Sequence, residues 1–100
     1  MSTRSVRPGS RSGQVTLRYW ASARAAADTG HDVVDVAGPV TLAELRTWAL
    51  QRHAGSARFA DVLGTCSVLV GERPVGRADP GDVVVEPGTT VEFLPPFAGG

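Results

Sequence analysis

The sequence predicts an α+β domain in which one mixed sheet carries one main helix on one of its faces. Three observations predict it: a period-two strand pattern early in the chain, one strongly capped helix in the middle, and short apolar strands that end at a double proline. The 100 residues are 42% hydrophobic, which suffices for a single domain with a modest core.

The first strand is predicted from a period-two pattern in which every second residue is apolar: Val15, Leu17 and Tyr19. We place its start, and the start of the folded domain, at Gln14. Residues 21–30 are expected to form a loop with a short alanine-rich turn. A second strand over residues 32–36 ends at Gly38-Pro39.

The main helix is predicted by a capping box at Thr41-Leu42-Ala43-Glu44, in which the side chains of Thr41 and Glu44 each satisfy a backbone N–H of the other. An apolar stripe continues to about His53. A second, shorter helical turn is expected before Gly64, because the apolar residues Phe59, Val62 and Leu63 are spaced as on one helical face.

The rest of the chain consists of predicted strands at residues 66–70, 83–85 and 90–94, separated by turns at 71–74, 79–82 and 86–89. Pro95-Pro96 ends the last strand, because proline lacks the N–H that a ladder requires. A right-handed crossover would place the last strand beside the first. This order of elements predicts the β-grasp, or ubiquitin-like, arrangement.

Composition limits the function classes. Ten Lys plus Arg balance ten Asp plus Glu, so the net charge predicts neither nucleic acid nor an anionic membrane as a partner. With no apolar run of membrane-spanning length, a cytoplasmic location is expected. Residues 1–13 are poor in apolar side chains, which predicts a disordered tail before a domain of residues 14–100.

Three segments together carry a resemblance to a known family: LRYWASAR at residues 17–24, TLAEL at 41–45 and FLPPFAGG at 93–100. With them, the chain resembles the MoaD/ThiS family of ubiquitin-like sulfur carriers. It is most similar to the MoaD branch, the small subunits of molybdopterin synthase. The double proline favours that branch over ThiS-like tails, whereas Pro87-Gly88-Thr89 departs from the Asp-Gly-Asp often found before the family's last strand.

The resemblance implies a chemistry at the end of the chain. A partner adenylyltransferase of the MoeB type would use ATP to adenylate the Gly100 carboxylate. Sulfur from a persulfide donor would then replace the adenylate to give a thiocarboxylate. The tail would insert into a MoaE-like large subunit, in a heterotetramer, and deliver sulfur to a pterin precursor. The chain itself would be a non-catalytic subunit that binds no cofactor and no metal.

The tail's composition agrees with that role. Gly99 and Gly100 lack a Cβ, so their backbone can thread a narrow channel. Residues 95–100 can span ~20 Å when extended, at ~3.3 Å per residue. Pro95-Pro96 stiffens the base of the tail, which lowers the ordering entropy lost on insertion.

Strand alternation predicts a partner-binding surface next to the tail. Trp20 and Leu94 would lie on the sheet face opposite the helix, where grouped apolar side chains usually mark a binding site. We expect Pro74 and Val75 to extend this surface and the tail residues to continue it: Pro95, Pro96, Phe97 and Ala98. The family resemblance implies Arg24 as a further candidate contact, because the matching family segment carries an arginine there; a solvated surface arginine is the alternative.

Other readings of the chemistry stay open. Cys66, the single cysteine, is either a persulfide carrier or, as we prefer from its place at the start of an apolar strand, a buried structural thiol. His31 and His53 lack a spaced third ligand for a metal. The turn carboxylates are expected to be solvated: Asp79, Asp82 and Glu86.

Three functional alternatives accompany sulfur carriage for molybdopterin. Two are carriers for thiazole (thiamin) synthesis and for cysteine synthesis, which use the same thiocarboxylate. The third is a β-grasp binding module or a protein modifier that couples Gly100 to lysines of other proteins. The chain contains no lysine, so chains linked through its own side chains are excluded.

Overall fold

A computed structural model describes residues 12–96 of the chain. The main sheet has five strands, and a separate pair of short strands lies beside it. The strands are β1 (Gly13–Tyr19), β2 (His31–Val36), β3 (Val40–Thr41), β4 (Ser67–Val70), β5 (Arg73–Pro74), β6 (Val84–Val85) and β7 (Thr90–Leu94). The helices are α1 (Ala21–Ala27), α2 (Leu42–Arg52), α3 (Ala57–Leu63) and the 3-10 turn η1 (Pro80–Asp82).

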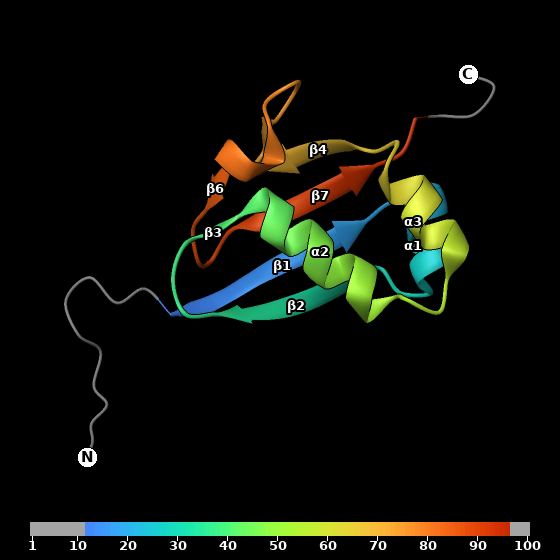
Figure 1. Cartoon of the computed structure of the whole chain (residues 1–100), viewed down its shortest axis with the longest axis horizontal. Helices are drawn as coiled ribbons and strands as arrows, with labels where there is room; N and C mark the ends of the chain where they lie inside the picture. Colours follow the sequence, from blue (N-terminus) through green and yellow to red (C-terminus); the bar gives the residue numbers. More distant parts are fainter. Residues whose placement is uncertain (1–11, 97–100) are drawn as a thin grey trace, which may run out of the picture.

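The main sheet has the order β2-β1-β7-β4-β5, while β3 pairs with β6. β1 lies antiparallel to β2 and parallel to β7, with Leu17 opposite Val91 and Tyr19 opposite Phe93. The prediction that the last strand returns beside the first is therefore confirmed. With α2 lying across one face of the sheet (Figure 1), the domain has the predicted β-grasp arrangement.

The capping box at the start of α2 is present as predicted. The Thr41 N–H donates to Glu44 Oε1 at 2.8 Å, and the Glu44 N–H donates to Thr41 Oγ1 at 3.1 Å. The helix then turns Leu42, Leu45 and Ala49 toward the sheet, and all three are buried. Local hydrogen bonding thus fixes where α2 begins, and its apolar stripe fixes which face packs.

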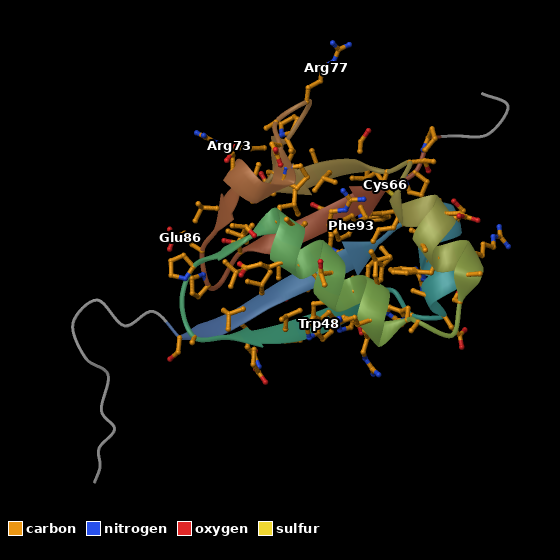
Figure 2. The ribbon with its side chains drawn as sticks, in the orientation of Figure 1. Trp48, Cys66, Arg73, Arg77, Glu86 and Phe93 are labelled. Carbon is orange, nitrogen blue, oxygen red and sulfur yellow. The ribbon has the colours of Figure 1, made fainter. Side chains whose placement is uncertain are left out.

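Alternation along β1 and β7 builds the core beneath α2. The inward side chains of these two strands are at most 2% exposed: Val15, Leu17, Tyr19, Val91 and Phe93. Figure 2 places Phe93 on the sheet behind α2. The face assigned to each of these residues from the period-two pattern is confirmed.

Residues 21–27 correct one prediction, because they form α1 rather than part of a loop. Alanine has the highest helix propensity, and Ala23 and Ala27 are buried within the core cluster. The helix ends at Asp28, whose backbone is left-handed with φ 60°. A seven-residue helix is marginal by itself, so its tertiary packing decides the outcome.

Two further strand pairs were not predicted. Residues 71–74 were expected as a turn, but Arg73 and Pro74 form β5 against Val70 and Leu69 of β4. Proline is tolerated there because β5 is an edge strand. The short β3–β6 pair joins Val40 to Val85 and Thr41 to Val84, and no local pattern predicts a pairing between residues so far apart in the sequence.

The arrangement of the ends positions the candidate site. β7 leads out of the sheet at the end where α1 and α3 pack, whereas β1 enters at the opposite end (Figure 1). β1 begins at Gly13, one residue before the predicted start. Most of the predicted disordered segment, and the tail residues Phe97, Ala98, Gly99 and Gly100, lie outside the described residues.

Candidate functional site: the open face of the sheet and the base of the tail

The sheet face opposite α2, called the open face below, carries side chains from every strand of the main sheet. Strand register places one row of residues directly across it: His31, Arg18, Glu92, Leu69 and Pro74. Paired residues of neighbouring strands point to the same face, so this row lies opposite the buried row of the core. The open face is therefore mixed, with charged and apolar side chains side by side.

Trp20, directly after β1, lies on this face and is 39% exposed. Its indole Nε1–H donates to Glu92 Oε1 at 2.9 Å, and the Arg18 guanidinium carbon lies 4.8 Å from the centre of its ring. A hydrogen bond at one edge and a cation over the ring hold the side chain in one orientation. Trp20 thus presents a fixed apolar surface to solvent.

Trp20, Ala21, Leu94 and Pro95 line a small apolar hollow, called the tail-base patch below. Its volume is about 140 Å³. Leu94 ends β7, and Pro95 is buried while Pro96 is exposed. The predicted juxtaposition of Trp20 and Leu94 is present in the structure, where the chain leaves the sheet; a role in binding a partner stays a prediction.

Pro74 and Val75, predicted together as an extension of this surface, separate in the structure. Pro74 is exposed and paired with Leu69, which places it on the open face but at the far edge from β2. Val75 is half-buried and packs against the core. Its backbone N–H donates to the Val68 carbonyl, which ties the segment after β5 to β4. Pro74 extends the open face, and Val75 does not.

Beneath the tail base lies a polar cluster that the sequence did not reveal. The Tyr19 hydroxyl donates to Asp32 Oδ2 at 2.8 Å, and His53 Nε2 lies 2.6 Å from the same oxygen. The Asp32 and His53 side chains are only 11% and 12% exposed, and Arg52 Nε lies 3.9 Å from Asp32 Oδ1. Burial first, then the hydrogen bond and charge of Asp32, raise the pKa of the Tyr19 phenol well above its ordinary value.

This cluster is built for holding elements together. It joins the end of β1, the start of β2 and the residue after α2, and the Tyr19 ring stacks on Phe93 at 5.9 Å. Asp32 pairs with Leu17 in the sheet and so occupies an inward position. A carboxylate on the inward face of a strand needs hydrogen-bonding partners inside the protein. The inward position of Asp32 in the alternation of β2 could therefore have predicted such a cluster.

Cys66 has the setting of a structural thiol. It is half-buried, packs against the core, and its Sγ–H donates to the Val62 carbonyl at 3.4 Å. Burial raises the pKa of the Cys66 thiol to about 11, although the Arg46 guanidinium opposes the shift. Because the thiolate is the nucleophile, this setting argues against the persulfide-carrier reading and favours the structural one.

Cys66 is therefore expected to react slowly. A pKa raised from 9.0 to about 11 lowers the thiolate fraction at pH 8 by about 100-fold, because that fraction falls tenfold per pKa unit at this pH. Iodoacetamide should alkylate the folded chain at least tens of times more slowly than the same chain in denaturant. Equal rates in the two states would contradict the structural assignment.

The raised pKa of the Cys66 thiol also makes the free energy of unfolding decrease at high pH. The unfolded chain releases its thiol proton near pH 9, while the folded chain keeps it until about pH 11. The unfolded state therefore binds fewer protons in this window, so the contribution of Cys66 to stability is complete below pH 9 and is lost through pH 11.

The other candidates lie on the surface. Asp79 and Asp82 lie in the turn that forms η1, where Asp79 Oδ1 accepts from the Gly81 N–H at 2.9 Å, and Glu86 is exposed in the turn after β6. Arg24 is exposed on α1. Within residues 12–96, no group of three or more His, Cys, Asp or Glu side chains is placed to hold a metal ion. No helix in that part of the chain could cross a bilayer.

Three comparisons bear on this geometry. The family model described as the ThiS family matches residues 17–100. The structure resembles the small archaeal modifier protein 1 of H. volcanii, with a TM-score of 0.68, 20% identity, and coverage of 85% of this chain and 99% of that chain. No curated protein matches the sequence.

Two further solved structures share the fold. The putative molybdopterin converting factor subunit 1 of Pyrococcus furiosus has a TM-score of 0.67 and 18% identity, covering 85% of this chain and 99% of that chain. One chain of the complex of subunits 1 and 2 of the molybdopterin-converting factor from Helicobacter pylori has a TM-score of 0.58 and 21% identity, covering 87% of this chain and 99% of that chain. The fold and the family model together lead to one conclusion: the chain belongs to the ThiS family and has a ubiquitin-like fold.

Proposed function

We propose that this protein carries sulfur as a thiocarboxylate on Gly100 and donates it in molybdopterin formation as a small synthase subunit. In the first step the Gly100 carboxylate attacks the α-phosphate of ATP on a partner adenylyltransferase, and pyrophosphate leaves. The terminal sulfur of a persulfide on a donor protein then attacks the acyl carbon, and AMP leaves. A thiol of the donor reduces the resulting acyl disulfide, which releases the thiocarboxylate on Gly100 and leaves a disulfide on the donor. The catalytic side chains belong to the partner enzymes.

The observation that carries the proposal is the tail-base patch at the point where the chain leaves β7. Pro95 is buried against the sheet, so the segment that follows starts from a fixed position. Trp20 is fixed by Glu92 and Arg18 and exposes an apolar surface beside that position. A partner that contacts the patch gains apolar burial and, with the same contact, aligns the tail with its own active site.

The choice of molybdopterin among the sulfur pathways rests on the sequence of the tail. The FLPPFAGG ending favours it, and the likeness in fold to the two molybdopterin converting factor structures is consistent with it. The proposal includes a large-subunit partner, as in the complex of subunits 1 and 2 from H. pylori. Thiazole and cysteine synthesis are the alternatives within the same chemistry.

Intact mass spectrometry tests the chemistry directly. Untagged protein is incubated with the cognate adenylyltransferase, ATP and a sulfur donor, and fragmentation locates any added mass. We expect a sulfur-for-oxygen increase confined to Gly100. An unmodified terminus with demonstrably active partner enzymes would overturn the proposal. Mixing the thiocarboxylated protein with each candidate large subunit then distinguishes a dithiolene pterin from a thiazole or cysteine.

Protein modification is the second candidate, favoured by the likeness in fold to the small archaeal modifier protein 1. A modifier would pass the same activated Gly100 to a lysine amine, which attacks the acyl carbon and displaces the leaving group. Incubating the activated protein with a lysine-rich acceptor distinguishes the two. An isopeptide at Gly100 that forms without sulfur incorporation would favour modification over carriage.

A further inference from the structure

A second hollow on the open face lies on the other side of Trp20 from the tail-base patch. It lies beside β1, the middle of α1 and the start of β2, and is lined by Thr16, Arg18, Tyr19, Trp20, Arg24, Thr29, Gly30 and His31. Its volume of about 510 Å³ falls within the ~300–1,000 Å³ usual for ligand sites. We call it the basic hollow.

The lining of the basic hollow is one-sided in charge. It contains two guanidinium groups and an imidazole, from Arg18, Arg24 and His31, and no carboxylate. In a chain whose net charge is zero, this segregation is local and is not a reflection of overall composition. A hollow of one sign focuses its field on a ligand of the opposite sign.

In the part of the chain that the structure describes, neither arginine of the hollow is neutralised by an ion pair. The ion pairs among residues 12–96 join Asp32 to Arg52 and to His53, and none involves Arg18 or Arg24. The nearest carboxylate to Arg18 in the sheet register is Glu92, which accepts from the Trp20 indole and does not line the hollow. With respect to residues 12–96, both guanidinium groups therefore keep donors that a ligand could use.

The side chains of the hollow are also held in place. Arg18 lies over the Trp20 ring, and the Arg24 guanidinium lies against Gly30, whose hypothetical Cβ would be 3.6 Å from Arg24 Nε. Preorganised donors lose less entropy on binding than free ones. Arg18 of β1 is thus held in one orientation, and Arg24 of α1 lines the same space.

From this arrangement we propose that the basic hollow binds an acidic segment of a partner protein. Trp20 belongs to both hollows, so the segment would place carboxylates beside Arg18 and Arg24 and an apolar side chain on the tail-base patch. The two guanidinium groups come from different elements, β1 and α1, across an open space much larger than one inorganic anion, which favours a peptide over free phosphate. The inference goes beyond the proposed function, because such binding does not require sulfur on Gly100.

An NMR titration of the ¹⁵N-labelled full chain tests this. The probe is an acetylated and amidated peptide, Glu-Glu-Asp-Glu-Leu-Phe, and its uncharged counterpart is Gln-Gln-Asn-Gln-Leu-Phe. We expect the acidic peptide alone to shift the amide signals of Thr16, Arg18, Arg24 and His31, with binding that weakens as salt is raised. The Arg18→Glu, Arg24→Glu double variant should bind at least about tenfold more weakly.

The matched control is the Arg73→Glu, Arg77→Glu double variant, which changes the net charge equally. β5 lies at the opposite edge of the sheet from β2, and Figure 2 shows Arg73 and Arg77 away from α1 and β2. Its binding should change by less than about twofold, since separated exposed charges are largely screened. Equal losses in the two double variants, equal binding of both peptides, or no shift at all would overturn the proposal.

Two additions keep the outcome decisive. If the Glu double variant loses its dispersed spectrum, the Arg18→Gln, Arg24→Gln variant replaces it, and it too must bind more weakly. Inorganic phosphate at equal charge concentration forms the third arm. Shifts of the same residues by phosphate but not by the acidic peptide would overturn the peptide in favour of a small anion.

Discussion

A chain that ends at Gly99 is expected to lose sulfur transfer while keeping its fold and its melting temperature. The shortened tail still ends in a glycine carboxylate, but that carboxylate stops ~3.3 Å short of its natural reach. A misplacement of about 1 Å can cost about 100-fold in rate, so the loss should exceed 100-fold. Stability should not change, because the core residues of β1, β7 and α2 are untouched.

Thiocarboxylate formation by mass spectrometry and a thermal melt by circular dichroism provide the two measurements. A variant with one alanine added after Gly100 is the matched control for length, and it too should be inactive, since the reactive carboxylate now belongs to another residue. Normal sulfur loading of the chain ending at Gly99 would show that the reach of the terminal carboxylate does not limit the reaction. A large fall in its melting temperature would mean that the tail contributes to the fold.

Replacing Asp32 by alanine is expected to give the largest loss of stability among the polar positions described here. Tyr19 and His53 both contact Asp32 Oδ2, and the Asp32 side chain is 11% exposed. Without Asp32, the largely covered Tyr19 hydroxyl and His53 Nε2 both lose their partner, and each polar group left unsatisfied typically costs about 1–3 kcal/mol. In a domain of this size each kcal/mol lowers the melting temperature by roughly 4–8 °C, so a fall of more than about 8 °C is expected.

Asp35→Ala is the matched control, on the same strand. Asp35 is exposed, and its Oδ1 accepts from the Gln14 amide at 3.0 Å on the surface. Exposed polar contacts contribute less than about 1 kcal/mol, so this variant should melt within a few degrees of the parent protein. Urea denaturation at pH 7 compares the two, and equal losses would contradict a buried clamp at Asp32.

The consequence of the Asp32 clamp reaches the tail base. Tyr19 stacks on Phe93, and β7 continues from Phe93 through Leu94 into Pro95. The clamp therefore contacts β7 through the Tyr19 ring, two residues before the tail base at Pro95. A Tyr19→Phe variant, which removes only the hydroxyl, should lose about 1 kcal/mol and keep the aromatic stack.

Several elements could be predicted because their signals are local. The capping box of α2 involves residues three apart, and its two hydrogen bonds form wherever that helix begins. β7 has the predicted bounds, because a short alternating segment lies between Pro87-Gly88 and Pro95. The positions of Trp20 and Leu94 followed from alternation along two strands, once those strands were taken as neighbours.

α1 could not be predicted with the same rules. Its alanines favour a helix, but seven residues do not hold one in water, and the left-handed backbone at Asp28 that ends it has no glycine to signal it. The burial of Ala23 and Ala27 in the core makes the difference. The helix propensity of these alanines favours α1, but the packing of Ala23 and Ala27 in the core supplies the free energy that makes the helix stable.

The sequence by itself determined the β-grasp order of elements, the start of α2, the inward faces of β1 and β7, and the diglycine ending that defines the proposed chemistry. The start of α2 and the inward faces of the strands follow from hydrogen bonds and periodicities within a few residues, and the diglycine is read directly from the sequence. Only the tertiary structure decided that Asp32 meets His53 across 21 positions, that Val75 turns inward, and that Arg18, Arg24 and His31 share one hollow. Such contacts depend on how separate helices and strands pack, and local sequence patterns do not predict contacts between residues far apart in the chain.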